Sequence, residues 1–288
     1  MHPVHTLYHY CGIDKFLSIA RGKEIWLSSL NLSNDFKEGK LVSETIMRLA
    51  KNHNLSESEH QRLAVSLKFF NMELHGLGFC LSEKGDLLSQ WRGYADDAFG
   101  VSIGFNCQFL ETFAISNNLD FKQITYEQSQ HDDVLNPIFS QLYESIKNGA
   151  FSIPGSVIYN FSPDFVKPTE NSDLKSTQTI DPFSKFATDL LKLVPSLFQL
   201  KGRAFSEEHE WRLISLFGYH PSEKCLFRIS KNRIIPYRKF KIEEYIYPII
   251  HEVVLGPKQE TPTEIVQSML AQAGFSNVTV RKSDAIYR

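Results

Sequence analysis

The hydrophobic and polar pattern of the first 30 residues predicts a strand, a helix and a second strand. Residues 7–11 (LYHYC) are rich in aromatic side chains, which favour extended chain. The next segment has Asp14 near its start and Gly22 just past its end, which is typical of a helix. Residues 25–28 (IWLS) then predict the second strand.

Two helices and two further strands are predicted in the following 80 residues or so. Asn34 and Asp35 carry side chains that can cap a helix, and Glu38 stands three residues after Asp35, which is the spacing of a capping box. The elements predicted for this part of the chain are helices over 38–53 and 57–73 and strands over 76–82 and 100–105.

The middle of the chain, residues 107–200, is predicted to be mainly helical. Its segment 150–182 is rich in Ser, Pro, Asn and Thr and predicts a loop. A helix over 183–200 is interrupted at Pro195, because proline lacks the amide donor of a helix interior. Apolar residues recur at helical spacing at Val134, Leu135, Ile138, Leu142 and Ile146.

Strand patterns return after residue 210 and decide the predicted fold class. Strands at both ends of the chain enclose a helical middle, which favours one α+β domain over residues 1–288 rather than two separate domains. We expect a mixed, largely antiparallel sheet built from N- and C-terminal strands, with a mainly helical insertion at about 107–200. The C-terminal elements predicted are strands over 211–216, 225–229, 253–256 and 278–280 and a helix over 262–273.

Composition places the chain among cytoplasmic globular proteins. With 42% hydrophobic and 22% charged residues, the chain can build a core and is unlike a disordered sequence. No apolar run approaches the roughly 20 residues of a membrane-spanning helix, and residues 1–6 lack the features of a signal peptide. We therefore expect no membrane partner.

Charge and cysteine content exclude two further classes. The net charge of −2 gives no bulk attraction for nucleic acid. The four cysteines are widely spaced, so they predict neither a disulfide framework nor a metal site of the CxxC type. We expect reduced core residues at Cys11, Cys80, Cys107 and Cys225.

The segment 88–97 (LSQWRGYADD) has the densest mixture of polar and aromatic groups, between two predicted strands. Trp91 and Tyr94 could stack a base or a nicotinamide, and Arg92 could hold a phosphate or a carboxylate through its planar fork. Alternatively, the two aromatic residues fill the core of a structural crossover, and Arg92 pairs with Asp96 or Asp97.

A second candidate is the acidic segment at the start of the strand predicted from residue 211. Glu208 and Glu210 stand where a rigid backbone can hold a carboxylate towards a ligand. The alternative is a solvated strand end with one or two salt bridges. His9 lies in the first predicted strand, facing away from Tyr8 and Tyr10, and is either a ligand-binding or a hydrogen-bonded core residue.

Two other patterns are weaker. The stretch from Lys231 to Lys241 (KNRIIPYRKFK) has no acidic residue, so it is either a solvated edge or a surface that contacts phosphate. His2, His5 and His9 have no second cluster with matching spacing, so we expect no metal.

The order of these segments resembles that of bacterial proteins containing the domain of unknown function 2971. The resemblance spans nearly the whole chain. It rests on residues 7–10, Asn34-Asp35 with Glu38, residues 89–94 (SQWRGY), 100–105, 208–212 (EHEWR) and 283–288.

A second resemblance is to the ADP-ribosyltransferase fold, in which an early-strand histidine, a middle aromatic residue and a late-strand glutamate surround NAD. His9, then Tyr94 or Trp91, then Glu210 follow this order. The resemblance implies that NAD is a substrate, that His9 binds the nicotinamide ribose and that the aromatic residue stacks on nicotinamide. Glu210 would hold a ribose hydroxyl and stabilise the positive charge that develops as the bond breaks. Glu208 would assist the acceptor.

The same resemblance extends the cofactor-binding set to Tyr10, which follows His9, and to Arg92. It implies a nucleic acid or a protein as the acceptor, and a role as a bacterial toxin or antiphage effector.

Two other functions stay open. One is a non-catalytic nucleic-acid or nucleotide-binding module that uses Trp91, Arg92, Tyr94 and the basic stretch. The other is a metal-dependent nuclease that uses Asp35, Glu38 and Asp96.

Overall fold

The structure is a computed structural model and describes residues 6–32, 39–152, 181–217, 225–230, 232–242 and 246–287. The first half of the chain forms β1 (Thr6–Cys11), α1 (Ile13–Gly22), β2 (Glu24–Ser29), α2 (Leu41–Lys51), α3 (Glu57–Glu73), β3 (His75–Ser82), α4 (Leu88–Tyr94), β4 (Val101–Asn106), α5 (Cys107–Ser116), β5 (Asp120–Gln123) and α6 (Gln128–Ser145). The second half forms a π-helical turn η1 (Ile146–Ala150), α7 (Pro182–Leu191), the 3-10 turns η3 (Val194–Ser196) and η4 (Arg203–Glu208), β6 (Glu210–Phe217), β7 (Leu226–Ser230), β8 (Arg233–Lys241), β9 (Ile250–Leu255), α8 (Thr263–Gln272) and β10 (Thr279–Lys282).

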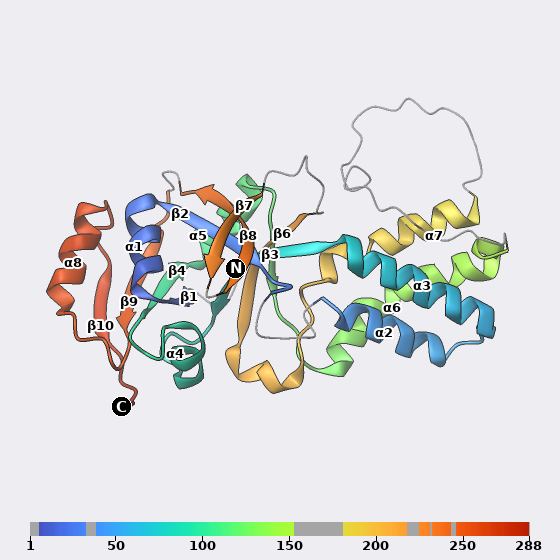
Figure 1. The fold of residues 1–288 in the computed structure, drawn as a ribbon, viewed down its shortest axis with the longest axis horizontal. Coiled ribbons are helices and arrows are strands. Elements are labelled where there is room, and N and C mark those ends of the chain that lie inside the picture. Colours follow the sequence, from blue (N-terminus) through green and yellow to red (C-terminus); the bar gives the residue numbers. More distant parts are fainter. Residues whose placement is uncertain are drawn as a thin grey trace, which may run out of the picture.

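The strands form one mixed, largely antiparallel sheet, which confirms the predicted α+β class (Figure 1). Within the described residues the order is β10-β9-β4-β1-β3-β2-β8-β7, and β6 joins β3 and β5. Every pairing of strands is antiparallel except β9 with β10. Strands from both ends of the chain meet in the sheet, since β4 pairs with β9 and β2 pairs with β8.

The sheet divides at β3. One edge of β3 pairs with β6 along its whole length, from His75 to Ser82. The other edge is shared: β2 pairs near the start of β3, at Leu77 and Gly78, and β1 pairs only at Ser82. The backbone between these pairings lacks a strand neighbour on that side, so its polar groups need other partners.

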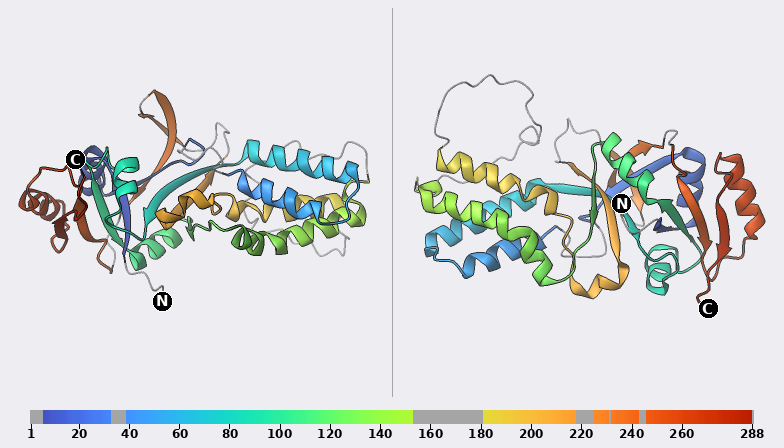
Figure 2. Two further views of the ribbon diagram at one scale, coloured as in Figure 1. Left: turned by 90° about the horizontal axis from the view of Figure 1, so that it is seen from below. Right: turned by 180° about the vertical axis from the view of Figure 1, so that it is seen from behind.

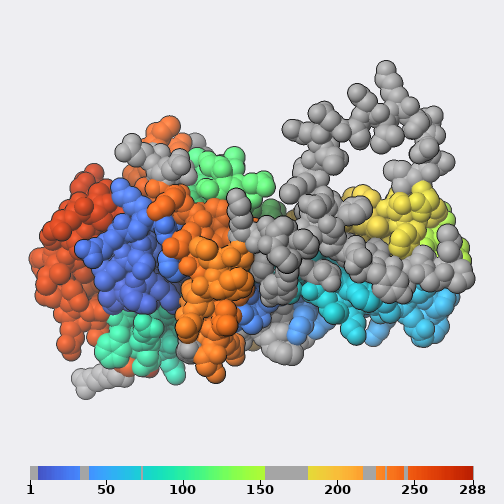
Figure 3. Space-filling view, turned by 45° about the horizontal axis from the view of Figure 1, so that its top comes forward, coloured from blue at the N-terminus to red at the C-terminus, as the bar shows by residue number. Residues whose placement is uncertain are grey.

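Two hydrophobic cores lie on either side of this division. Helices α1, α5 and α8 pack on the sheet core, and α2, α3, α6 and α7 pack around a second core at the other end of the elongated molecule (Figures 1 and 2). Strand β6 contributes to both, because Leu213 packs in the sheet core and its neighbour Ile214 in the helical one. In the space-filling view, the helices α3 (cyan) and α7 (yellow) lie at the opposite end of the molecule from the C-terminal elements (red) (Figure 3).

The helical end differs from the single insertion expected at about 107–200. It draws α2 and α3 from residues 41–73 as well as α6 and α7 from the middle of the chain. Helix α5, although within 107–200, packs instead on the sheet core. The expected loop at 150–182 lies mostly outside the described residues.

Other local predictions have clear outcomes. The helix predicted over 57–73 is confirmed as α3, and a capping box between Ser56 and Glu59 fixes its start. The predicted break at Pro195 is also confirmed, since α7 ends at Leu191 and Pro195 lies in η3. The capping residues Asn34, Asp35 and Glu38 lie outside the described residues.

Several elements were not predicted from the sequence, among them the short strand β5 inside the region expected to be mainly helical. The segment with Trp91, between two predicted strands, is a short helix, α4. Most of the basic stretch forms β8, whose Pro236 pairs opposite Phe227 of β7. Proline normally argues against an inner strand, which is why this one escaped prediction. A search of the described helices finds none that could span a membrane.

Candidate functional site

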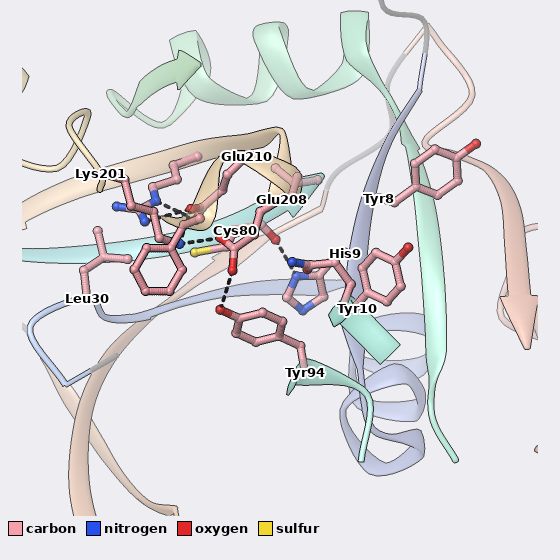
Figure 4. A pocket seen from close by; sticks show the side chains of 13 residues that line it. Tyr8, His9, Tyr10, Leu30, Cys80, Tyr94, Lys201, Glu208 and Glu210 are labelled. Atoms are coloured by element: carbon pink, nitrogen blue, oxygen red, sulfur yellow. Dashed lines mark hydrogen bonds and ion pairs between the residues drawn. The ribbon is translucent and has the colours of Figure 1, made fainter. Parts of the chain in front are cut away.

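A pocket of about 90 Å³ lies where β1 and β2 part along β3 (Figure 4). Its walls come from β1, β3, α4 and the start of β6, with Leu30 from the end of the β2 segment. It is lined by Tyr8, His9, Tyr10, Leu30, Cys80, Leu81, Gln90, Tyr94, Lys201, Phe205, Glu208, Glu210 and Arg212. Five of the predicted site residues thus meet in one place: His9, Tyr10, Tyr94, Glu208 and Glu210.

His9 provides a hydrogen-bond partner for a backbone carbonyl of β3 that has no strand neighbour on that side. Its Nδ1 lies 2.8 Å from the carbonyl oxygen of Cys80, and its ring stacks on Phe79 with centroids 4.0 Å apart. Burial lowers the pKa of His9 to about 4, although the bond to Cys80 acts in the opposite direction. The imidazole is therefore neutral at pH 7. Because a carbonyl only accepts, Nδ1 carries the proton and Nε2 is an acceptor.

Glu210 is held by two cations. Arg212 donates from Nε to Oε1 of Glu210 over 2.6 Å and from Nη2 to Oε2 over 2.9 Å, and Lys201 Nζ donates to Oε2 over 2.8 Å. Burial by itself would raise the pKa of Glu210, but the charges of Arg212 and Lys201 outweigh it and lower the pKa to about 2. Glu210 is therefore an oriented carboxylate at neutral pH.

Glu208 is tied to the same lysine and to Tyr94. Lys201 Nζ donates to Oε2 of Glu208, and the Tyr94 hydroxyl donates to Oε1 over 3.1 Å. Burial and the charge of Glu208 raise the pKa of Tyr94, so its hydroxyl stays protonated. Two carboxylates and two cations thus form one network with no net charge: Lys201, Glu208, Glu210 and Arg212.

A left-handed residue brings the two carboxylates to the same side. His209, between them, has φ 44° and ψ 53° and ends η4. The Ser82 hydroxyl donates to the carbonyl of Glu208 over 2.6 Å, and the amide of Glu210 donates to the Tyr126 hydroxyl over 2.8 Å. The turn is therefore fixed on both sides of His209.

The other predicted binding residues have different positions. Trp91 is fully buried, donates from Nε1 to Asp86 over 2.7 Å and packs edge-to-face on Tyr10, so its faces are closed to a ligand. Arg92 does not line the pocket, and its guanidinium lies 5.9 Å from the ring centre of Tyr287. The alternative in which the two aromatic residues fill the core is therefore correct for Trp91 but not for Tyr94, which lines the pocket.

Tyr10 lines the pocket with its ring, while its hydroxyl has structural partners. The hydroxyl donates to the carbonyl of Lys84 over 2.7 Å and accepts from the amide of Leu87 over 2.9 Å. These bonds hold the loop that leads into α4. Tyr10 can therefore offer a ligand its ring surface but not a hydrogen bond.

Sequence reasoning missed Gln90, Lys201 and Arg212 as pocket residues. Glu210 and Arg212 alternate along a strand and so share a face, which is a signal that the sequence did contain. Gln90 and Tyr94 are one helical turn apart and also share a face. Nothing around Lys201 in the sequence indicates its role, because its partners are Glu208 at the end of η4 and Glu210 at the start of β6.

Two lysines of the basic stretch pair with a carboxylate of a neighbouring strand. Glu24 of β2 pairs with Lys241 at 2.7 Å and with Lys239 at 3.5 Å, and Lys239 also lies over the ring of Trp26. Arg238 donates to the Ser215 hydroxyl over 3.0 Å. Lys231 lies outside the described residues.

Of the three residues proposed for a nuclease, the structure describes Asp96 alone. Asp35 and Glu38 lie outside the described residues, and Asp96 lies against Gly12 at the start of α1. Over the described ranges, no group of three or more His, Cys, Asp and Glu side chains could hold a metal ion.

Comparison with known proteins gives a family match. Residues 90–213 match the family described as "Protein of unknown function (DUF2971)". The predicted family resemblance is confirmed over this stretch. No curated protein and no solved structure matches the chain. The DUF2971 match starts at Gln90 in α4 and ends at Leu213 in β6, so it includes Tyr94, Lys201 and both glutamates but not His9.

The neutral state of His9 predicts how stability depends on pH. Its folded pKa of about 4 lies below the value of 6.5 for an exposed histidine, so its contribution is present above pH 6.5 and is lost as the pH falls towards 4. The loss is on the order of 3 kcal/mol. His9→Gln keeps a neutral donor for Cys80 and should flatten the stability curve between pH 6.5 and 4. Urea unfolding at several pH values across this range measures the free energy of unfolding of the wild type and the variant. His60→Gln, at a histidine of α3 outside the pocket, should leave the curve unchanged.

The left-handed turn predicts opposite effects for two changes at one position. His209→Gly removes the steric cost of positive φ and should raise the free energy of unfolding by up to about 1 kcal/mol. His209→Val, with a β-branched side chain, should lower it by about 1–2 kcal/mol. Denaturant unfolding at pH 7 distinguishes the two. Equal effects of glycine and valine would show that the side chain of His209, and not its backbone, matters.

Proposed function

We propose that this chain is an ADP-ribosyltransferase-like enzyme that uses NAD to modify a nucleic acid or a protein. The observation that carries the proposal is the convergence of His9, Tyr94 and Glu210 on one pocket, although they come from β1, α4 and β6. These residues are far apart in the sequence and follow the order of the transferase fold. A chance set of three such residues has no reason to meet.

The charges of the pocket suit the bond that would break. When the bond between nicotinamide and ribose breaks, its electron pair leaves with nicotinamide and positive charge develops on the ribose. Glu210, kept ionised and fixed by Arg212 and Lys201, would stabilise that charge and accept a bond from a ribose hydroxyl. The nucleophile of the acceptor then bonds to the ribose carbon and loses a proton, for which Glu208 is the nearby carboxylate.

The size of the pocket limits which part of NAD it would take. A pocket that encloses a drug-sized ligand measures roughly 300–1,000 Å³, whereas this one measures about 90 Å³. A closed cavity of about 150 Å³ can hold benzene, so a single ring would fill this smaller pocket and extend into its mouth. The nicotinamide end would enter, and the ADP end would lie outside.

The test is NAD cleavage by the purified protein, followed as free nicotinamide and as ADP-ribose attached to added protein, DNA or RNA. Glu208→Gln and Glu210→Gln should each lower the rate by about 10²-fold or more, as loss of a transition-state contact does. Glu264→Gln, on exposed α8, is the matched control and should leave the rate unchanged.

Glu208→Gln is needed beside Glu210→Gln because the latter deprives buried Arg212 of its carboxylate. The melting temperature of each variant separates a loss of activity from a loss of folding. If the wild-type protein releases no nicotinamide and labels no acceptor of the three classes, the proposal fails.

A further inference from the structure

Gln90 is a buried amide whose side chain has no hydrogen-bond partner among the described residues. It lies in α4, is only 7% exposed and lines the pocket. Its amide atoms are open to the pocket and not enclosed by protein, and the polar groups of a largely buried side chain nearly always have partners. Its position in the pocket wall indicates that the partner is a bound molecule.

The polar groups around Gln90 are already committed. The Tyr94 hydroxyl, one turn further along α4, donates to Glu208, and the Trp91 indole donates to Asp86. Lys201 and Arg212 bind the two glutamates. Of the residues that α4 contributes to the pocket wall, Gln90 is therefore the one that can recognise a ligand through new hydrogen bonds. The hydroxyl of Ser89, in the same helix, also lacks a partner among the described residues but does not line the pocket.

His9 supplies a second uncommitted atom in the same pocket. Its Nδ1 donates to Cys80, which leaves Nε2 as an acceptor. Gln90 can both donate and accept. A ligand that uses both residues must offer a donor to His9 Nε2 and either a donor or an acceptor to Gln90. A primary carboxamide has this combination, and the rings of Tyr10 and Tyr94 line the pocket for the ring that bears it.

We propose that Gln90 is a substrate-binding residue that recognises a primary carboxamide on an aromatic ring, which in NAD is the carboxamide of nicotinamide. This inference rests on the proposed function for the identity of the ligand. It assigns to the pocket a preference for the amide over the corresponding acid. The carboxylate of nicotinic acid has no N–H for His9 Nε2, and a charged carboxylate costs more to bury than a neutral amide.

The inference can be tested by binding, without any reaction. Calorimetry at pH 7 should show nicotinamide binding to the wild-type protein at least ten-fold more tightly than nicotinic acid. Gln90→Met, which keeps the length of the side chain but not its amide, should weaken nicotinamide binding at least ten-fold. Gln267→Met, at an exposed glutamine of α8, is the matched control and should bind like the wild type.

The outcomes distinguish this inference from the proposed function. If nicotinamide binds, Gln90→Met abolishes binding and NAD is not cleaved, the inference stands and the transferase proposal falls. If NAD is cleaved but Gln90→Met leaves both KM and nicotinamide affinity unchanged, the inference alone is overturned. Equal binding of nicotinic acid and nicotinamide, or no binding of nicotinamide, would also overturn it.

Discussion

The buried ion pair between Arg212 and Glu210 is the interaction on which the pocket depends. Arg212 is 1% exposed and also donates to the carbonyl of Phe198 over 3.0 Å, so it links β6 to the segment that enters the helical core. Removing one partner of such a pair leaves an uncompensated buried charge and costs about 3–5 kcal/mol. Lys201 extends the pair to Glu208, and the network thereby fixes η4 against β6.

The division of the sheet at β3 provides the space in which this network can face a ligand. With β1 and β2 apart, the carbonyl of Cys80 has no strand partner on that side and is satisfied by His9. A buried carbonyl requires such a partner. One hydrogen bond thus satisfies the carbonyl of Cys80 in β3, sets the tautomer of His9 and keeps its ring at the pocket wall.

Much of the fold follows from local patterns. Strand patterns identified β1, β2 and β3, and the helix predicted over 57–73 has the observed bounds of α3. Local signals failed where long-range pairing decides. The basic residues of β8 resemble a solvated edge until Glu24 of β2 is placed beside them. Helices α2 and α6 share a core that spacing along the chain does not reveal.

The sequence by itself determined the residue types at the site: a histidine in the first strand, a polar-aromatic segment in the middle and a pair of glutamates before a late strand. Only the tertiary structure decided which of them face the pocket. It placed Trp91 in the core, left Arg92 outside and exposed Gln90 and Tyr94 to the pocket, because packing of α4 against β1 selects one helix face. Lys201 contacts both glutamates because of the conformation of η4. The ion-pair partners of a buried charge depend on the three-dimensional fold and not on spacing along the chain.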